Sequence, residues 1–129
     1  MRTVALIATC AALVSCDTGP AEVLPMCGTD AVISVGSGTQ PTVSWTPNCA
    51  ATWAWVETLP RSTGGIVPIA WQKYASEGSF RSPVRVKTDS TIIMGPEEVE
   101  LVQGQRYQAC LINDGWPGWS YLSCTEFTP

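Results

Sequence analysis

The stretch Leu101-Val102-Gln103-Gly104-Gln105-Arg106-Tyr107 decides the fold, because it combines a tight turn with a tyrosine placed to close that turn. Gly104 permits the turn, since glycine adopts backbone conformations that other residues avoid. Tyr107 is expected to bury its ring while its hydroxyl hydrogen-bonds to backbone across the corner. Corners of this kind join the two sheets of a β-sandwich.

The chain around this corner repeats one pattern, in which short runs rich in Val, Ile, Thr and Trp alternate with Gly, Pro, Asn and Ser. The runs are 31–35, 42–46, 52–57, 67–74, 83–88, 97–102, 105–113 and 119–127. In the second run Val43 and Trp45 point to one side, which is typical of a strand with one buried face. About seven short strands and no helical period predict an all-β antiparallel sandwich.

Two segments resemble fibronectin type III domains. Residues 101–107 resemble that family's L-x-P-G-x-x-Y corner, with Gln103 where proline is usual. The segment PTVSWTPN, residues 41–48, is similar to the family's second strand, with Trp45 as its core tryptophan. The resemblance implies an Ig-like or fibronectin type III-like sandwich over residues 30–129, and it carries almost no functional information.

The first sixteen residues, MRTVALIATCAALVSC, resemble a bacterial lipoprotein signal peptide. Arg2 precedes a short apolar run, and the segment Leu13-Val14-Ser15-Cys16 matches the order apolar, variable, small, cysteine. The apolar run is too short to span a bilayer and fits a cleaved leader. We therefore expect a signal peptide over residues 1–15 and lipidation of Cys16, followed by a tether over 16–29. The expected location is lipid-anchored and extracytoplasmic, on the bacterial cell membrane or the outer membrane.

Composition argues against several functions. The chain of 129 residues has a net charge of −4 and scattered basic residues, which disfavours nucleic acid as a partner. It has no histidine and no nucleophile motif, so we expect no enzyme activity, no cofactor and no metal. The carboxylates Glu97, Glu98 and Glu100 are expected to form a solvated strand face, with Val99 and Leu101 pointing inward.

Four cysteines follow the expected anchor: Cys27, Cys49, Cys110 and Cys124. An even number in an oxidising compartment predicts disulfides, and four cysteines allow three connectivities. The strand order that the resemblance implies favours Cys27–Cys49 and Cys110–Cys124.

Tryptophans supply the candidate binding residues, and the chain has six of them. Trp53 and Trp55 have the same parity on one strand, so they either both fill the core or both lie on the outer sheet face. In the second case Trp71, on the next strand, could extend an exposed platform. The turn over residues 113–119 carries Trp116 and Trp119 and lies at the end of the sandwich where the tether arrives.

These features predict a non-catalytic protein-binding module anchored to the envelope. The alternative is a carbohydrate- or peptidoglycan-binding module. A flat exposed strip of Trp53, Trp55 and Trp71 would favour sugar, whereas a protruding tip with Trp116 and Trp119 would favour protein.

Overall fold

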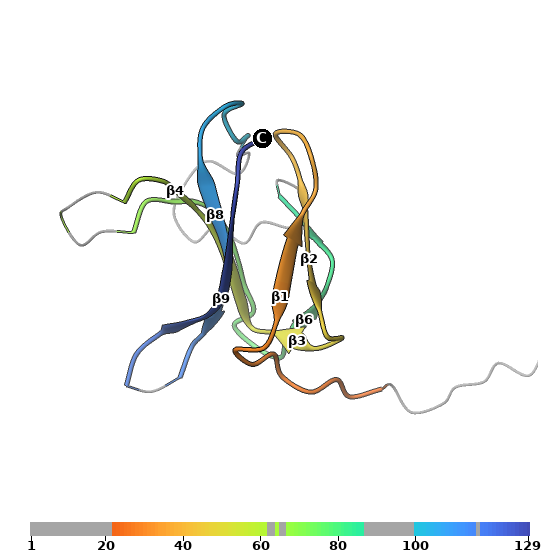
Figure 1. The fold of residues 1–129 in the computed structure, drawn as a ribbon. Coiled ribbons are helices and arrows are strands. Elements are labelled where there is room, and N and C mark those ends of the chain that lie inside the picture. Colours follow the sequence, from red (N-terminus) through yellow and green to blue (C-terminus); the bar gives the residue numbers. More distant parts are fainter. Residues whose placement is uncertain (1–21, 62–63, 65–66, 87–99, 116) are drawn as a thin grey trace, which may run out of the picture.

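The computed structural model describes residues 22–61, 64, 67–86, 100–115 and 117–129. Within these ranges the chain forms nine strands (Figure 1). They are β1 (Val32–Val35), β2 (Thr42–Thr46), β3 (Ala50–Ala51), β4 (Trp53–Thr58), β5 (Ile69–Tyr74), β6 (Phe80–Arg81), β7 (Val84–Arg85), β8 (Tyr107–Asn113) and β9 (Ser120–Phe127). The expected all-β class is confirmed. No helix of the described ranges is long and apolar enough to cross a membrane.

Two antiparallel sheets face each other in a β-sandwich-like arrangement (Figure 1). One has the order β1-β2-β7 and the other β5-β4-β8-β9. A third sheet, β3-β6, lies at the end where the N-terminal segment arrives. Strand β1 also contacts β9, so the two large sheets approach each other along one edge.

The core between the sheets is built from alternate residues of the strands. In β2, Val43 and Trp45 are buried while Thr42 and Thr46 are exposed, as the alternation predicts. The Trp45 indole N–H donates a hydrogen bond to the carbonyl oxygen of Cys49 at 3.1 Å. This ring therefore enters the core without leaving its one donor unpaired.

The corner at residues 101–107 forms as expected. Tyr107 is buried, and its hydroxyl accepts a hydrogen bond of 2.8 Å from the backbone N–H of Val102. Gly104 has a φ of 81°, in the left-handed region that favours glycine. The Tyr107 ring stacks on Phe127 of β9 at a centroid distance of 5.8 Å, which ties the corner to the last strand.

The predicted strand over 97–102 is wrong for the part that the structure describes. Residues 100–102 form no strand, and 97–99 lie outside the described residues. The Leu101 N–H donates to the carbonyl oxygen of Thr39 at 3.0 Å, and the Val102 N–H donates to the corner tyrosine. Because a loop and the corner take both donors, neither is available to a strand ladder. Leu101 is nevertheless buried, as predicted.

Of the predicted run at 83–88, residues 83–86 are described, and β7 is the strand that they form. The short strands β3 and β6 were not predicted as separate elements. The leader, Cys16 and Trp116 lie outside the described residues. The first predicted disulfide, Cys27–Cys49, is confirmed.

The N-terminal segment is fixed to the sandwich before β1 begins. The Cys27 N–H donates to the carbonyl oxygen of Ala50 at 2.8 Å, and the guanidinium of Arg81 donates to that of Glu22 at 2.6 Å. The Cys27–Cys49 disulfide adds a covalent link at the same place, with about 3 kcal/mol of expected stabilisation. The chain therefore enters at one defined end, which is also the end of the β8–β9 turn (Figure 1).

Candidate functional site

The outer face of the sheet β5-β4-β8-β9, which points away from the main core, gathers the candidate site residues. Strand pairing aligns their side chains in two rows: Tyr74, Trp53, Ile112 and Tyr121 in one, and Gln72, Trp55, Cys110 and Cys124 in the next. Between them on β4, Ala54 and Val56 point the other way, into the main core. Of the two possibilities for Trp53 and Trp55, the outer face is therefore the one observed.

A register shift in β9 completes the first row. Tyr121 pairs with Ile112 and Ser123 pairs with Leu111, so Leu122 is an extra residue in β9. Strict alternation from Cys124 would turn Tyr121 toward the main core. The bulge reverses the side on which the chain presents its side chains, and Tyr121 joins the outer face.

Trp55 lies at the centre of an outer cluster, which comprises Trp53, Trp55, Val67, Cys110, Ile112, Trp119, Tyr121 and Cys124. Trp55 is only 1% exposed. Three rings meet its indole edge to face: Trp53 at a centroid distance of 5.1 Å, Trp119 at 5.0 Å and Tyr121 at 5.6 Å. Each of these edge-to-face pairs stabilises the fold by about 0.5–1.5 kcal/mol beyond the contribution of the apolar area that it buries.

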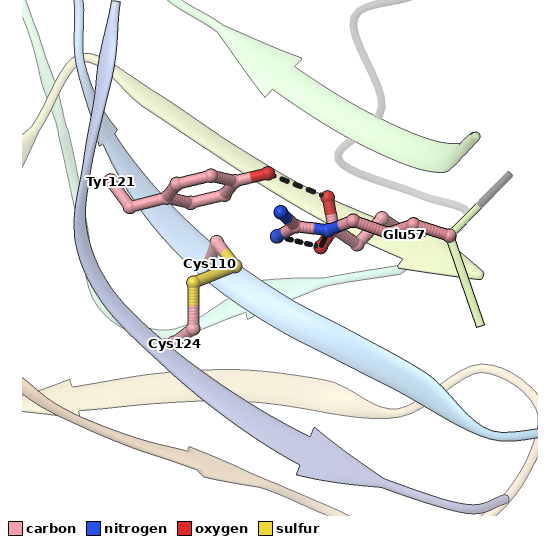
Figure 2. Close-up of a disulfide and its surroundings, with 5 residues drawn as sticks. Glu57, Cys110, Tyr121 and Cys124 are labelled. Atoms are coloured by element: carbon pink, nitrogen blue, oxygen red, sulfur yellow. Dashed lines mark hydrogen bonds and ion pairs between the residues drawn. A yellow bond between two sulfur atoms is a disulfide. The ribbon is translucent and has the colours of Figure 1, made fainter. Parts of the chain in front are cut away.

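The second disulfide forms part of the same cluster. Cys110 and Cys124 lie directly opposite each other on β8 and β9 and are bonded, as predicted (Figure 2). The bond closes a loop with a sequence separation of 14, for which about 3 kcal/mol of stabilisation is expected. It also fixes β9, and with it Tyr121, against the rest of the sheet.

A buried carboxylate lies at the end of the outer cluster that is farther from the β8–β9 turn. Glu57 is 0% exposed. The Arg61 guanidinium donates to Glu57 Oε1 from Nε at 2.9 Å and from Nη2 at 2.6 Å. The Tyr121 hydroxyl donates to Oε2 at 3.0 Å (Figure 2). Both carboxylate oxygens are therefore paired, which a buried charge requires.

The pKa values of the two neighbours of Glu57, Tyr121 and Arg61, are both raised. Burial, followed by the hydrogen bond to Glu57, raises the pKa of Tyr121 above its ordinary value near 10. The hydrogen bond to Glu57 raises the pKa of Arg61. The Arg61 guanidinium carbon also lies 4.8 Å from the centre of the Tyr121 ring, within cation–π range. The raised pKa values keep Tyr121 a protonated phenol and Arg61 a cation at neutral pH.

Trp53 marks the other end of the cluster, where the surface is hollowed. A depression of about 240 Å³ is lined by Trp53, Gln72, Tyr74 and Asp114. The Trp53 indole N–H donates to Gln72 Oε1 at 3.2 Å, and the Tyr74 hydroxyl donates to Asp114 Oδ2 at 2.7 Å. This second bond links β5 to the start of the β8–β9 turn.

The platform of three tryptophans, one of the alternatives that the sequence left open, does not form. Trp71 pairs with Val56 and is buried in the main core, so the expectation that it could extend an outer platform is wrong. Trp55 is on the outer face but covered. Trp119 is 45% exposed and lies just before β9, while Trp116 lies outside the described residues.

Sequence reasoning missed five contributors to this face: Glu57, Arg61, Gln72, Tyr74 and Tyr121. One available signal was parity, because Glu57 lies two residues beyond Trp55 and shares its side of the strand. No local signal pairs Tyr74 with Asp114, which lie 40 positions apart. Within the described residues no three His, Cys, Asp or Glu side chains are grouped to hold a metal ion.

Comparison with protein families, with curated proteins and with solved structures found no match to this chain. The structure itself establishes the class of the domain. It is an all-β, sandwich-like domain with two disulfides and an aromatic cluster on its outer face.

The substitution Arg61→Leu is expected to lower the free energy of unfolding by about 2 kcal/mol, because the Glu57 carboxylate stays buried without its cation. Arg61 is half exposed, so the loss is smaller than for a fully buried pair. Urea denaturation followed by tryptophan fluorescence measures it.

The matched control is Arg106→Leu, which removes the ion pair with Glu126 between two exposed side chains. This control is expected to change stability by less than about 1 kcal/mol. Equal losses in the two variants would contradict the assignment of Glu57 as a buried, dependent charge.

Proposed function

We propose that this chain is a non-catalytic protein-binding module of the bacterial cell envelope, with Trp119 as its principal contact. The observation that carries the proposal is the state of this one side chain. Trp119 is 45% exposed, yet its ring is held edge to face by Trp55 at 5.0 Å and by Tyr121 at 5.3 Å. A tryptophan that is ordered before binding loses little conformational freedom on contact, which favours a binding hot spot.

The geometry supports a protein partner better than a glycan bound along a tryptophan strip. Such a strip needs several flat faces side by side, and here Trp71 is in the main core and Trp55 is covered. The remaining exposed indole of the described residues, Trp119, lies on a hairpin that projects from the sandwich (Figure 1). A half-exposed aromatic ring on a projecting hairpin suits contact with a partner protein.

We also propose that the fold is an Ig-like, fibronectin type III-like sandwich. Two observations support this assignment. The sheet orders β1-β2-β7 and β5-β4-β8-β9 correspond to strands A-B-E and C′-C-F-G of that architecture. The hydroxyl of Tyr107 bonds back to Val102 across the turn that precedes β8.

Lipidation of Cys16 completes the proposal by setting where the module acts. The first described residue, Glu22, is already held by Arg81. The intervening backbone spans at most about 20 Å when fully extended. The β8–β9 turn lies at the same end of the sandwich (Figure 1). A lipid on Cys16 would therefore keep Trp119 close to the membrane surface, where a partner in or beside that membrane can reach it.

The contact is tested by affinity capture from an envelope extract, with the full chain, Trp119→Ala and Val102→Ala as immobilised baits. Val102 is the control, because it is 65% exposed and belongs to the corner before β8, away from the outer cluster. We expect a protein retained by the full chain and by Val102→Ala, and at least tenfold less of it on Trp119→Ala. Equal retention on Trp119→Ala, or saturable glycan binding on an array in place of a protein, would count against the proposal.

The anchor is tested by metabolic labelling with palmitate in cells that express the full chain or Cys16→Ala. We expect label and membrane association in the full chain, and neither label nor stable anchoring through lipid in the variant. Cys10→Ala, which lies within the expected signal peptide, is the matched control and should take up palmitate as the full chain does. Equal labelling of Cys16→Ala would refute the anchor at this position.

A further inference from the structure

The hollow beside Trp53 differs from the rest of the outer face, because polar and aromatic groups line it together. Trp53 comes from β4, Gln72 and Tyr74 from β5, and Asp114 from the start of the β8–β9 turn. The volume of about 240 Å³ is enough for one side chain or one small ligand group. The Trp53 and Tyr74 rings stand 5.3 Å apart with an angle of 72° between their planes, so they form two walls that are nearly perpendicular.

Two hydrogen bonds occupy the side-chain donors of the two aromatic residues in this hollow. The Trp53 N–H is committed to Gln72 Oε1, and the Tyr74 O–H to Asp114 Oδ2. That second bond raises the pKa of Tyr74, so the phenol stays protonated at neutral pH and keeps donating. The Asp114 carboxylate retains lone pairs on both oxygens for a further donor. The hollow thus suits a ligand that brings its own N–H groups.

The charge of the hollow has one sign. Asp114 is the charged residue among the four that line it. Lys73 lies between the two lining residues of β5, but its ammonium is directed to the ring of Phe80, 5.1 Å away. Arg61, at the other end of the cluster, is paired with Glu57. The net charge of the chain, −4, adds a weak attraction for cations.

We infer that this hollow binds an organic cation, the ammonium or guanidinium of a lysine or arginine side chain of the partner protein. The aromatic rings of Trp53 and Tyr74 attract a cation through their quadrupoles, and a carboxylate accepts its N–H groups. A neutral sugar is a poorer fit, because it gains neither a cation–π contact with the rings nor the charge attraction of Asp114. The protein source of the cation rests on the proposed function, whereas the cation site itself stands on the lining residues.

The probe experiment uses the full chain, ¹⁵N-labelled, in a nonionic polyoxyethylene detergent, which brings neither a sugar nor a quaternary ammonium headgroup. Nα-acetyl-lysine methylamide and Nα-acetyl-arginine methylamide are titrated while the indole N–H signal of Trp53 is followed. The uncharged comparison probes are Nα-acetyl-norleucine methylamide and N-acetylglucosamine. We expect saturable shifts with the two cationic probes, with Kd on the order of 1 mM, and none with the uncharged probes.

Asp114→Asn is the decisive variant, because it removes the charge while its side-chain oxygen still accepts from Tyr74. We expect it to weaken both cationic probes roughly tenfold. The matched control Glu126→Gln removes another exposed carboxylate of the same sheet and should leave binding unchanged. Equal affinity of Asp114→Asn and the parent chain, or an equal response to norleucine and lysine probes, would overturn the site.

Two further comparisons separate this inference from the proposed function. Trp119→Ala should bind the cationic probes as the parent chain does, so unchanged partner capture by this variant, together with intact probe binding, would refute only the Trp119 contact. Butylammonium carries the same cationic end as lysine without peptide groups, and we expect it to bind severalfold more weakly than the capped lysine. The reverse order would contradict a polypeptide source of the cation.

Discussion

Strand β4 must bury side chains on both of its faces, and the other features of the molecule follow from this constraint. Antiparallel sheets commonly leave one face to water. Here Ala54 and Val56 enter the main core, while Trp55 and Glu57 are covered on the opposite side. Within the described residues the cover has two sources. The β8–β9 hairpin places Trp119 and Tyr121 against the face, and the connection between β4 and β5 adds Arg61 and Val67.

Covering this face buries polar groups, and only some of them find hydrogen-bond partners. Glu57 is fully paired by Arg61 and Tyr121. The indole N–H of Trp55, by contrast, has no acceptor among the described residues, which costs about 1–3 kcal/mol. The Cys110–Cys124 disulfide and three edge-to-face ring contacts stabilise the covered face and offset this loss. The result is a rigid backing that leaves two features accessible at its margin: the ring of Trp119 and the hollow beside Trp53.

Much of this arrangement could be predicted from local sequence. The Tyr107 corner, the core position of Trp45 and both disulfide pairings depend on strand order and alternation, and the structure confirms them. Features that depend on register could not be predicted. The bulge at Leu122 turns Tyr121 outward, and a second irregularity separates Val56 from Glu57 in the pairing with β5. The side of Trp71 stayed open from sequence, because it depends on the register between β4 and β5, in which Trp71 lies opposite Val56.

Hydrogen exchange of the tryptophan indole N–H groups, followed by NMR, tests the covered outer face most directly. Trp71 provides the internal reference for the main core, and Trp119 the reference for the surface. Trp55 and Trp71 are each 1% exposed, and neither indole N–H has an acceptor in the part of the chain that the structure describes, so burial protects both. The account predicts that Trp55 exchanges as slowly as Trp71, through global unfolding, while Trp119 exchanges rapidly. Exchange of Trp55 at the rate of Trp119 would show that the outer face is open to water and would contradict the account.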